Sequence, residues 1–370
     1  MNFGSVYKSV SKDYPAKPVV EFYDTGHSVI NHICGGGFPA GRVVEFASEP
    51  GVGKTTIVLS ACLGMVERGK NVLFIDSETS LNDSLLEGVG LYNHIGKGFA
   101  PHAANTWPEV QCILEQYLAK KKDGLDIHAV CLDSITNVLP TASVEADLEK
   151  IWVGRKSQLQ GRFFEKYKAR FADDGICTIL INQARVKINM QNPKLSRPEG
   201  AGGFAMKHNV DVSIFLKKRN SKLIFDPATK EEIGAEVYLQ SVKNKMAGSR
   251  VGEVVILYGK GIDEAVSLAN FFVQTSGCER HGGWYTLDVP GWEGPAKVQG
   301  LHPVIEGIRA NTAVVQKYLI DQGMLKGIDT GRVDGKIKKS SHKNKSKTPA
   351  PDAESPIKKS TPIQKESFEL

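Results

Sequence analysis

Cysteine is scarce in this sequence of 370 residues: the six that occur include no C-x-x-C pair, and none has a histidine nearby at zinc-site spacing. This absence argues against a zinc-binding module. Cys62, Cys131 and Cys177 lie inside apolar stretches, a position that favours buried thiols over metal ligands or disulfides. We therefore expect a reducing, cytoplasmic compartment.

Long apolar runs are also missing. No stretch is long enough to span a bilayer, and the first residues, MNFGSVYKSVSKDYP, lack the apolar segment of a secretory signal. We therefore expect no membrane partner. Excess charge is small as well, because the formal net charge is only +6, which permits a polyanionic partner without requiring one.

Short apolar runs alternate with helical patterns along the chain. Four runs are apolar nearly throughout, as in parallel strands buried on both faces: 43–46, 71–76, 128–133 and 177–182. Helical spacing of apolar residues falls between them, at 54–68, 108–122 and 155–171. Three later runs follow one another closely, which favours antiparallel additions at the sheet edge: 212–216, 237–242 and 254–259. The pattern predicts a three-layer α/β fold with a mostly parallel central sheet.

Composition changes twice toward the C-terminus. Helical segments near 262–276 and 303–322 flank GGWYTLDVPGW and predict a small subdomain. Beyond Gly331 lysine, serine and proline dominate, and such a segment cannot bury enough apolar surface to become ordered. We therefore divide the chain into an N-terminal segment, an α/β core, a C-terminal subdomain and a disordered tail, with the bounds 1–24, 25–262, 263–330 and 331–370.

The stretch FASEPGVGKTT (46–56) joins a predicted strand to a predicted helix. Backbone N–H groups in such a turn and the helix N-terminus form a cradle for phosphates, which disfavours the alternative of a chance glycine-rich turn. Lys54 would supply a charge for the β- and γ-phosphates and Thr55 a hydroxyl for Mg²⁺, and Gly53 is expected to leave room for the phosphates. Ser48 replaces the first glycine of G-x-x-x-x-G-K-[ST]. The predicted ATP-binding stretch is Ser48, Glu49, Pro50, Gly51, Val52, Gly53, Lys54, Thr55 and Thr56.

Polar residues end three further predicted strands. HAVCLDS ends with Asp133, which can hold Mg²⁺ through water, although a turn or helix-capping aspartate is the alternative. NVLFIDSE ends with Asp76 and Glu78, and a glutamate beside a γ-phosphate can act as general base toward water. CTILINQ ends with Asn182 and Gln183, and a neutral amide there can bond a γ-phosphate and lose that bond after hydrolysis.

A long basic loop follows Gln183. Loops of this length in compact domains are commonly functional, and we expect this one to bind a polyanion in step with the bound nucleotide. A solvated surface loop is the alternative. The predicted contacts are Arg185, Lys187, Lys194, Arg197, Gly202 and Gly203.

Several segments resemble, in order, the motifs of RecA-type recombinases: GGGFPAGRVVEFASEPGVGKTT, VLFIDSE, AVCLDS, ILINQARVKI, GAGGFAMKHNVDV and SVKNKMAGSRVGEVVILYGKGID. The match runs from about residue 25 to 285, and GGWY with the helix after it is similar to the phage UvsX-like branch. The order and spacing make this set far more specific than a P-loop alone.

The resemblance implies a RecA-like P-loop ATPase core that binds ATP and Mg²⁺ and hydrolyses ATP to ADP and phosphate in response to DNA. It implies a helical filament of identical subunits on single-stranded DNA, which pairs and exchanges strands with homologous double-stranded DNA in recombination and repair. A single-strand-binding protein or a mediator is a further expected partner. The expected setting is the cytoplasm of a bacterium or a phage-infected host cell.

Roles at the nucleotide follow from the same resemblance. Lys54 and Thr55 bind phosphate and Mg²⁺, Glu78 activates water, Asp133 supports the metal, and Gln183 senses the γ-phosphate. These roles agree with the chemistry of each side chain at its strand end.

Other matches concern the neighbouring subunit and DNA. Lys243 and Lys245 match lysines that reach a neighbour's ATP, and residues at i and i+2 of a strand face one side, although a solvated sheet edge is the alternative. Tyr258 matches a position near the adenine. Residues 184–204 correspond to the second DNA-binding loop, and 143–157, with Arg155, correspond loosely to the first.

Departures from the family pattern limit these expectations. Residues 1–24 would form a shortened oligomerisation segment, and the tail begins basic where bacterial RecA tails are acidic. Trp284 and Tyr285 are expected to pack in the subdomain rather than stack on bases. A ring-shaped helicase motor, a recombination mediator and a nucleotide-binding scaffold without turnover remain alternatives, although VKNK and GAGGFAMK favour a recombinase.

Overall fold

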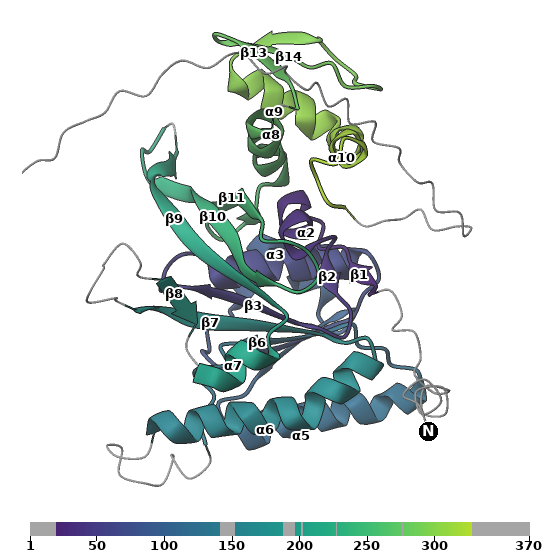
Figure 1. The fold of residues 1–370 in the computed structure, drawn as a ribbon, viewed down its shortest axis with the longest axis vertical. Coiled ribbons are helices and arrows are strands. Elements are labelled where there is room, and N and C mark those ends of the chain that lie inside the picture. Colours follow the sequence, from purple (N-terminus) through teal and green to yellow (C-terminus); the bar gives the residue numbers. More distant parts are fainter. Residues whose placement is uncertain are drawn as a thin grey trace, which may run out of the picture. The chain divides into compact units, whose positions relative to one another are not determined.

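A central β-sheet organises the chain in the computed structural model (Figure 1), which describes residues 20–140, 152–187, 197–200, 203–226, 228–275 and 277–327. The strands of this sheet are β3 (Val43–Ser48), β4 (Val72–Asp76), β5 (Phe99–Ala103), β6 (Ala129–Asp133), β7 (Cys177–Lys187), β8 (Arg197–Gly200), β9 (Val212–Phe225), β10 (Glu232–Asn244), β11 (Val251–Leu257) and β12 (Gly261–Ile262). Two smaller sheets contain β1 (Phe22–Tyr23) with β2 (Phe38–Pro39), and β13 (Glu279–His281), β14 (Trp284–Thr286) and β15 (Lys297–Gln299).

Helices flank the sheet. They are α2 (Ser28–Cys34), α3 (Lys54–Glu67), α4 (Asp83–Val89), α5 (Trp107–Ala119), α6 (Trp152–Asp173), α7 (Gly203–Asn209), α8 (Glu264–Gln274), α9 (Leu301–Ala310) and α10 (Thr312–Asp321), with 3₁₀ turns at Tyr92–His94 and Lys120–Asp123.

The sheet order is β12-β11-β10-β9-β3-β7-β6-β4-β5, and β8 pairs with β7 beyond this path. From β9 to β5 all neighbouring strands are parallel, whereas β10, β11 and β12 add to β9 in antiparallel pairs. This arrangement confirms the predicted three-layer α/β fold, its mostly parallel sheet and its antiparallel edge.

Two apolar cores lie on the two faces of the sheet. One contains side chains of α2, α3, α4 and α8, together with α9 and α10, and the other contains side chains of α5 and α6. A strand between two such cores needs apolar residues at every position, and all five residues of β6 are buried. The two-sided core therefore explains why these strands are apolar runs rather than alternating patterns.

Some elements differ from the sequence prediction. The strand β5, FAPHA, was not predicted, because proline and polar residues interrupt its apolar pattern. The single helix expected at 303–322 is two helices, α9 and α10, which meet at Asn311. The Asn311 side chain donates to the carbonyls of Glu293 and Gly307 (both 2.9 Å), so it holds the corner in place.

The two adjacent aromatic residues of β14 have different environments. Tyr285 is buried and belongs to the same core as α8 to α10, as expected of a packing residue. Trp284 is 44% exposed, and the Lys297 ammonium lies 5.6 Å from its ring centroid. In the described part of the chain, no helix has the length and apolarity that crossing a bilayer requires.

Candidate nucleotide-binding site

The carboxyl ends of four parallel strands bring the predicted polar residues to one edge of the sheet. Asp76 at the end of β4 pairs in register with Asp133 at the end of β6, and Ser48 at the end of β3 pairs with Gln183 in β7. This edge of a parallel sheet is where α/β proteins bind ligands. Residues that are far apart in sequence therefore meet near the N-terminus of α3.

Two glycines shape the turn between β3 and α3. Gly51 has φ +74° and Gly53 has φ +99°, so both adopt a left-handed backbone. A Cβ on Gly51 would meet nothing within 4 Å, whereas a Cβ on Gly53 would lie 2.4 Å from Ile256 Cδ1. The left-handed backbone angle of Gly53 and its approach to the terminal methyl of Ile256 favour glycine independently of the expected reason, room for bound phosphates, which stays a prediction.

Replacing Gly53 by alanine is expected to lower the free energy of unfolding by about 3 kcal/mol, because left-handed strain adds to displacement of Ile256. Gly69→Ala is the matched control, since Gly69 has φ +72° and open space around its Cβ position; it should lose only about 1 kcal/mol. Chemical unfolding of both variants measures the difference. Equal losses would show that Ile256 yields without cost.

Lys54 folds back onto the turn. Its Nζ lies 3.1 Å from both Ser48 Oγ and the Glu49 carbonyl oxygen. Ser48 is buried, and its hydroxyl donates to the Glu49 carbonyl (2.7 Å). Burial lowers the pKa of Lys54 below its ordinary value, and the nearby carboxylates of Asp133 and Glu78 offset only part of this shift. The residue that replaces the usual first glycine thus supplies an acceptor that holds the lysine over the turn.

A half-buried threonine, Thr55, and a buried aspartate, Asp133, form the floor of the site. Thr55 Oγ1 donates to Asp133 Oδ2 (2.7 Å), and Asp133 is 1% exposed. Asp133 Oδ1 is buried without a hydrogen-bond partner among the described residues. Burial raises the pKa of Asp133 to about 7. A hydroxyl beside a carboxylate oxygen that lacks a partner is a donor set that suits Mg²⁺, so these residues fit that metal.

The raised pKa of Asp133 predicts a pH effect in the metal-free protein. Between the unfolded value of 3.8 and about 7, the folded state keeps a proton that the unfolded chain has lost. Stability therefore falls as pH rises through this window and levels off above it. Relative to Asp133→Asn, which cannot ionise, the unmodified protein should lose roughly 3 kcal/mol between pH 5 and pH 8. Chemical unfolding in the presence of a chelator measures the free energy of unfolding of both proteins at each pH. The same pH dependence in the unmodified protein and in Asp133→Asn would contradict the prediction.

Glu78 lies beside the floor and is held by two residues that the sequence analysis missed. Ser134 Oγ and Asn137 Nδ2 donate to Glu78 Oε1 at 2.6 and 2.8 Å. Asp76 accepts from the backbone N–H groups of Glu78 and Leu81 (both 2.9 Å). The polar run SITN directly after Asp133 was the available signal for Ser134 and Asn137. Asp76 orders the loop, and Ser134 and Asn137 orient the Glu78 carboxylate.

The two amides at the end of β7 differ in environment. Asn182 is fully buried and donates to Glu45 Oε1 (2.6 Å), and Glu45 also accepts from Ser213 Oγ (2.6 Å). Gln183 is exposed beside Ser48. Asn182 thus fixes the strand inside the sheet, whereas the Gln183 side chain is exposed at the sheet edge beside Ser48.

Lys243 and Lys245 lie at the other end of the sheet. Lys243 pairs in register with Ser213, which pairs with Glu45 near the start of β3, whereas the phosphate turn follows the end of β3. Lys243 Nζ donates to the Lys207 carbonyl, and Lys245 Nζ forms an ion pair with Asp211 (2.8 Å). The strand β3 is about 15 Å long, and most of its length separates the two lysines from the phosphate turn of their own chain.

Tyr258 follows β11 two residues after Ile256, which contacts the turn. Its ring is 42% exposed, its hydroxyl donates to Glu232, and the Lys218 ammonium lies 5.3 Å from its centroid. These contacts leave part of the ring exposed to solvent.

The predicted DNA-binding residues are only partly described. Arg185 and Lys187 lie on β7 and pair in register with Glu199 and Arg197 of β8, so a two-stranded antiparallel ribbon forms the base of the loop. Gly203 begins α7, and Arg155 lies in the first turn of α6. Outside the described residues lie Lys194, Gly202, the stretches 143–151 and 188–196, most of the segment 1–24 and the tail 331–370.

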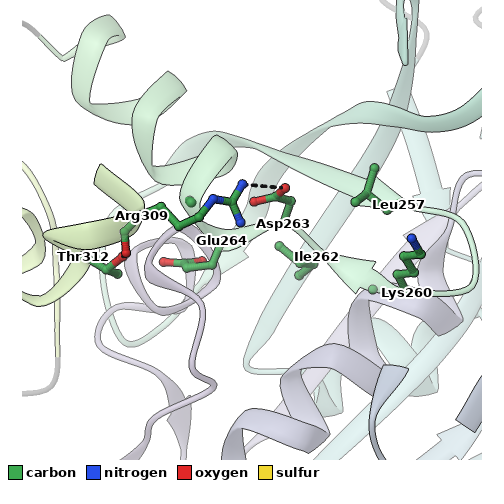
Figure 2. A pocket seen from close by; sticks show the side chains of 9 residues that line it. Leu257, Lys260, Ile262, Asp263, Glu264, Arg309 and Thr312 are labelled. Carbon is green, nitrogen blue, oxygen red and sulfur yellow. Dashed lines mark hydrogen bonds and ion pairs between the residues drawn. The ribbon is translucent and has the colours of Figure 1, made fainter. Parts of the chain in front are cut away.

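A separate hollow of about 380 Å³ lies between the start of α8 and the helices α9 and α10 (Figure 2). Arg309 reaches Asp263 across it (3.5 Å), and Asp263 also caps α8. Glu264 accepts from the backbone N–H of Ser28 (3.0 Å). Arg309 thus links α9 to the first turn of α8, and Glu264 links α8 to the start of α2.

Comparison with known proteins agrees with this geometry. A family model described as the RecA N-terminal domain matches residues 3–263. The chain is similar to Protein RecA of Parasynechococcus marenigrum (strain WH8102), at 28% identity over 313 residues, which covers 83% of this chain and 78% of that protein. It is 30% identical over 275 residues to Protein RecA of Frankia casuarinae, covering 74% and 76% of the two chains. It is 26% identical over 276 residues to Protein RecA of Borrelia duttonii (strain Ly), covering 74% and 73%. The resemblance found in the sequence is thereby confirmed, and the chain belongs to the RecA family of P-loop proteins, which act in DNA recombination and repair.

Proposed function

We propose that the protein is an ATP-dependent DNA recombinase that assembles as a filament on single-stranded DNA and exchanges strands with homologous duplex DNA in the cytoplasm. The observation that carries the proposal is the placement of Lys54, Thr55, Asp133, Glu78 and Gln183 at one sheet edge of a RecA-family chain. The relatives named Protein RecA support it.

The proposed chemistry is transfer of the γ-phosphoryl group to water. The backbone of the 49–53 turn and Lys54 hold the phosphates, and Thr55 and Asp133 hold Mg²⁺. When bound, Mg²⁺ neutralises charge on the phosphate oxygens. Glu78, oriented by Ser134 and Asn137, accepts the proton of the attacking water.

Filament formation would complete the site. Lys243 and Lys245 lie at the sheet end opposite their own chain's turn, so they suit the nucleotide of a neighbouring copy. Tyr258 would contact the adenine from the side of the turn. Bound ATP then joins two subunits, and its hydrolysis removes that link.

Coupling to DNA would pass through Gln183. This residue lies beside the phosphate turn and two residues before Arg185, at the base of the β7–β8 ribbon. A bond from Gln183 to the γ-phosphate would fix the ribbon and its basic loop, which we propose holds the DNA backbone together with Arg155 and its neighbours. A single-strand-binding protein or a mediator would assist loading.

A nucleotide-binding scaffold without turnover and a ring-shaped motor are less well supported. A scaffold without turnover does not need a carboxylate oriented toward the nucleotide, as Glu78 is by Ser134. The lysines at the far end of the sheet suit an interface between subunits of a filament.

Strand exchange between circular single-stranded DNA and a homologous linear duplex tests the proposal. Joint molecules are expected with ATP and Mg²⁺, and none without ATP or with a non-homologous duplex. Product without ATP, or none under any loading condition, would reject the function.

A further inference from the structure

Three lysines converge on the end of α7, which packs against α6 (Figure 1). Lys168 Nζ, from α6, donates to the Asn209 carbonyl (2.9 Å), and Lys243 Nζ donates to the Lys207 carbonyl. Lys245 pairs with Asp211 (2.8 Å). Cations are favourable at a helix C-terminus, where carbonyl groups carry partial negative charge. The cluster thus combines three ammonium groups with one carboxylate.

Asp211 is fixed in place. It is 2% exposed, its N–H donates to the Val43 carbonyl (2.9 Å), and its Oδ2 accepts from the Val43 N–H (3.2 Å). Only Oδ1 faces Lys245. Because the first residue of β3 holds this carboxylate, it cannot follow a lysine that moves away.

Lys245 is held less tightly. Its side chain is 46% exposed, so its ammonium group reaches solvent. The half-exposed lysine side chain is long enough to exchange Asp211 for a more highly charged ligand, and the buried carboxylate that it would leave unpaired opposes this exchange. A triphosphate carries several negative charges where Asp211 carries one.

Resting on the proposed function, we propose that Asp211 is a built-in competitor for Lys245, which the triphosphate of a neighbouring copy displaces. In the isolated subunit, Asp211 neutralises Lys245 and keeps it beside α7. At the interface between subunits, Lys245 turns to the nucleotide. Asp211 thereby sets how much nucleotide assembly requires.

The test is the concentration of a non-hydrolysable ATP analogue that gives half-maximal assembly on single-stranded DNA, followed by light scattering. Asp211→Asn keeps an acceptor for Val43 but loses the charge, and it should lower this concentration at least fivefold. Asp211→Ser should also lower the analogue concentration at half-maximal assembly. It tests the inference if the Asp211→Asn variant does not fold. Asp174→Asn, which breaks a distant ion pair with Lys121, is the matched control and should leave it unchanged.

A double variant separates competition from a merely structural role. In a Lys245→Ala background, Asp211→Asn should have no further effect, because the charge that it frees is gone. An unchanged or raised midpoint in Asp211→Asn, or a shift that persists without Lys245, would overturn the inference. Failure of the unmodified protein to assemble with analogue and DNA would instead reject the proposed function.

Discussion

Lys54→Ala is expected to lower the rate of ATP hydrolysis at least a thousandfold. The lysine ammonium is held over the turn, where the phosphates would bind, by Ser48 Oγ and the Glu49 carbonyl. Removing a fixed charge that stabilises developing negative charge costs on the order of 10²–10³ in rate, and weaker nucleotide binding adds to this loss. Phosphate release in the presence of single-stranded DNA measures it.

Lys120→Ala is the control for this variant, because Lys120 is 68% exposed at the end of α5 and pairs only with Asp123 among the described residues. It should hydrolyse ATP at the unmodified rate. Hydrolysis within tenfold of normal in Lys54→Ala would mean that the turn is not the catalytic phosphate site, whatever it binds.

Gln183→Ala is expected to separate nucleotide binding from the response to DNA. Gln183 is exposed and is not part of the hydrogen-bonded pair of Thr55 and Asp133. The affinity of Gln183→Ala for ATP should therefore change by no more than about twofold. DNA stimulation of hydrolysis should fall at least tenfold, since the link from γ-phosphate to ribbon is broken. Fluorescent-nucleotide binding and phosphate release with and without DNA measure the two effects.

The exposed Gln322, beyond α10, provides the matched glutamine control, and Gln322→Ala should keep full DNA stimulation. Unchanged stimulation in Gln183→Ala would exclude this residue as the switch. Equal loss of nucleotide binding and stimulation would assign it to the binding of ATP alone.

The sheet and most of the site could be predicted because a parallel sheet simplifies the problem. Each strand that lies between the two apolar cores can be recognised in the sequence as an apolar run. The carboxyl ends of all these parallel strands lie at the same edge of the sheet. Lys54, Asp133 and Glu78 could therefore be placed together from strand ends alone. Local chemistry, in the form of a hydroxyl after a lysine or acids after a strand, gave each residue its expected role.

What could not be predicted depends on contacts between distant parts of the chain. The approach of the Ile256 terminal methyl to position 53 is one such contact, and no local pattern shows it. The pairing of Asp211 with Lys245 needs the register of β9 against β10. An amphipathic pattern continues from α9 into α10, so the sequence does not show that the helix is divided. The hydrogen bonds of the Asn311 side chain mark the corner between the two helices.

We propose that bound triphosphate decides whether the chain holds single-stranded DNA. Titration of a fluorescent oligonucleotide with the full-length protein, at one fixed salt concentration, tests it most directly. With a non-hydrolysable ATP analogue and Mg²⁺, affinity should be at least tenfold higher than with ADP or without nucleotide. Equal affinity in all three conditions would contradict the account.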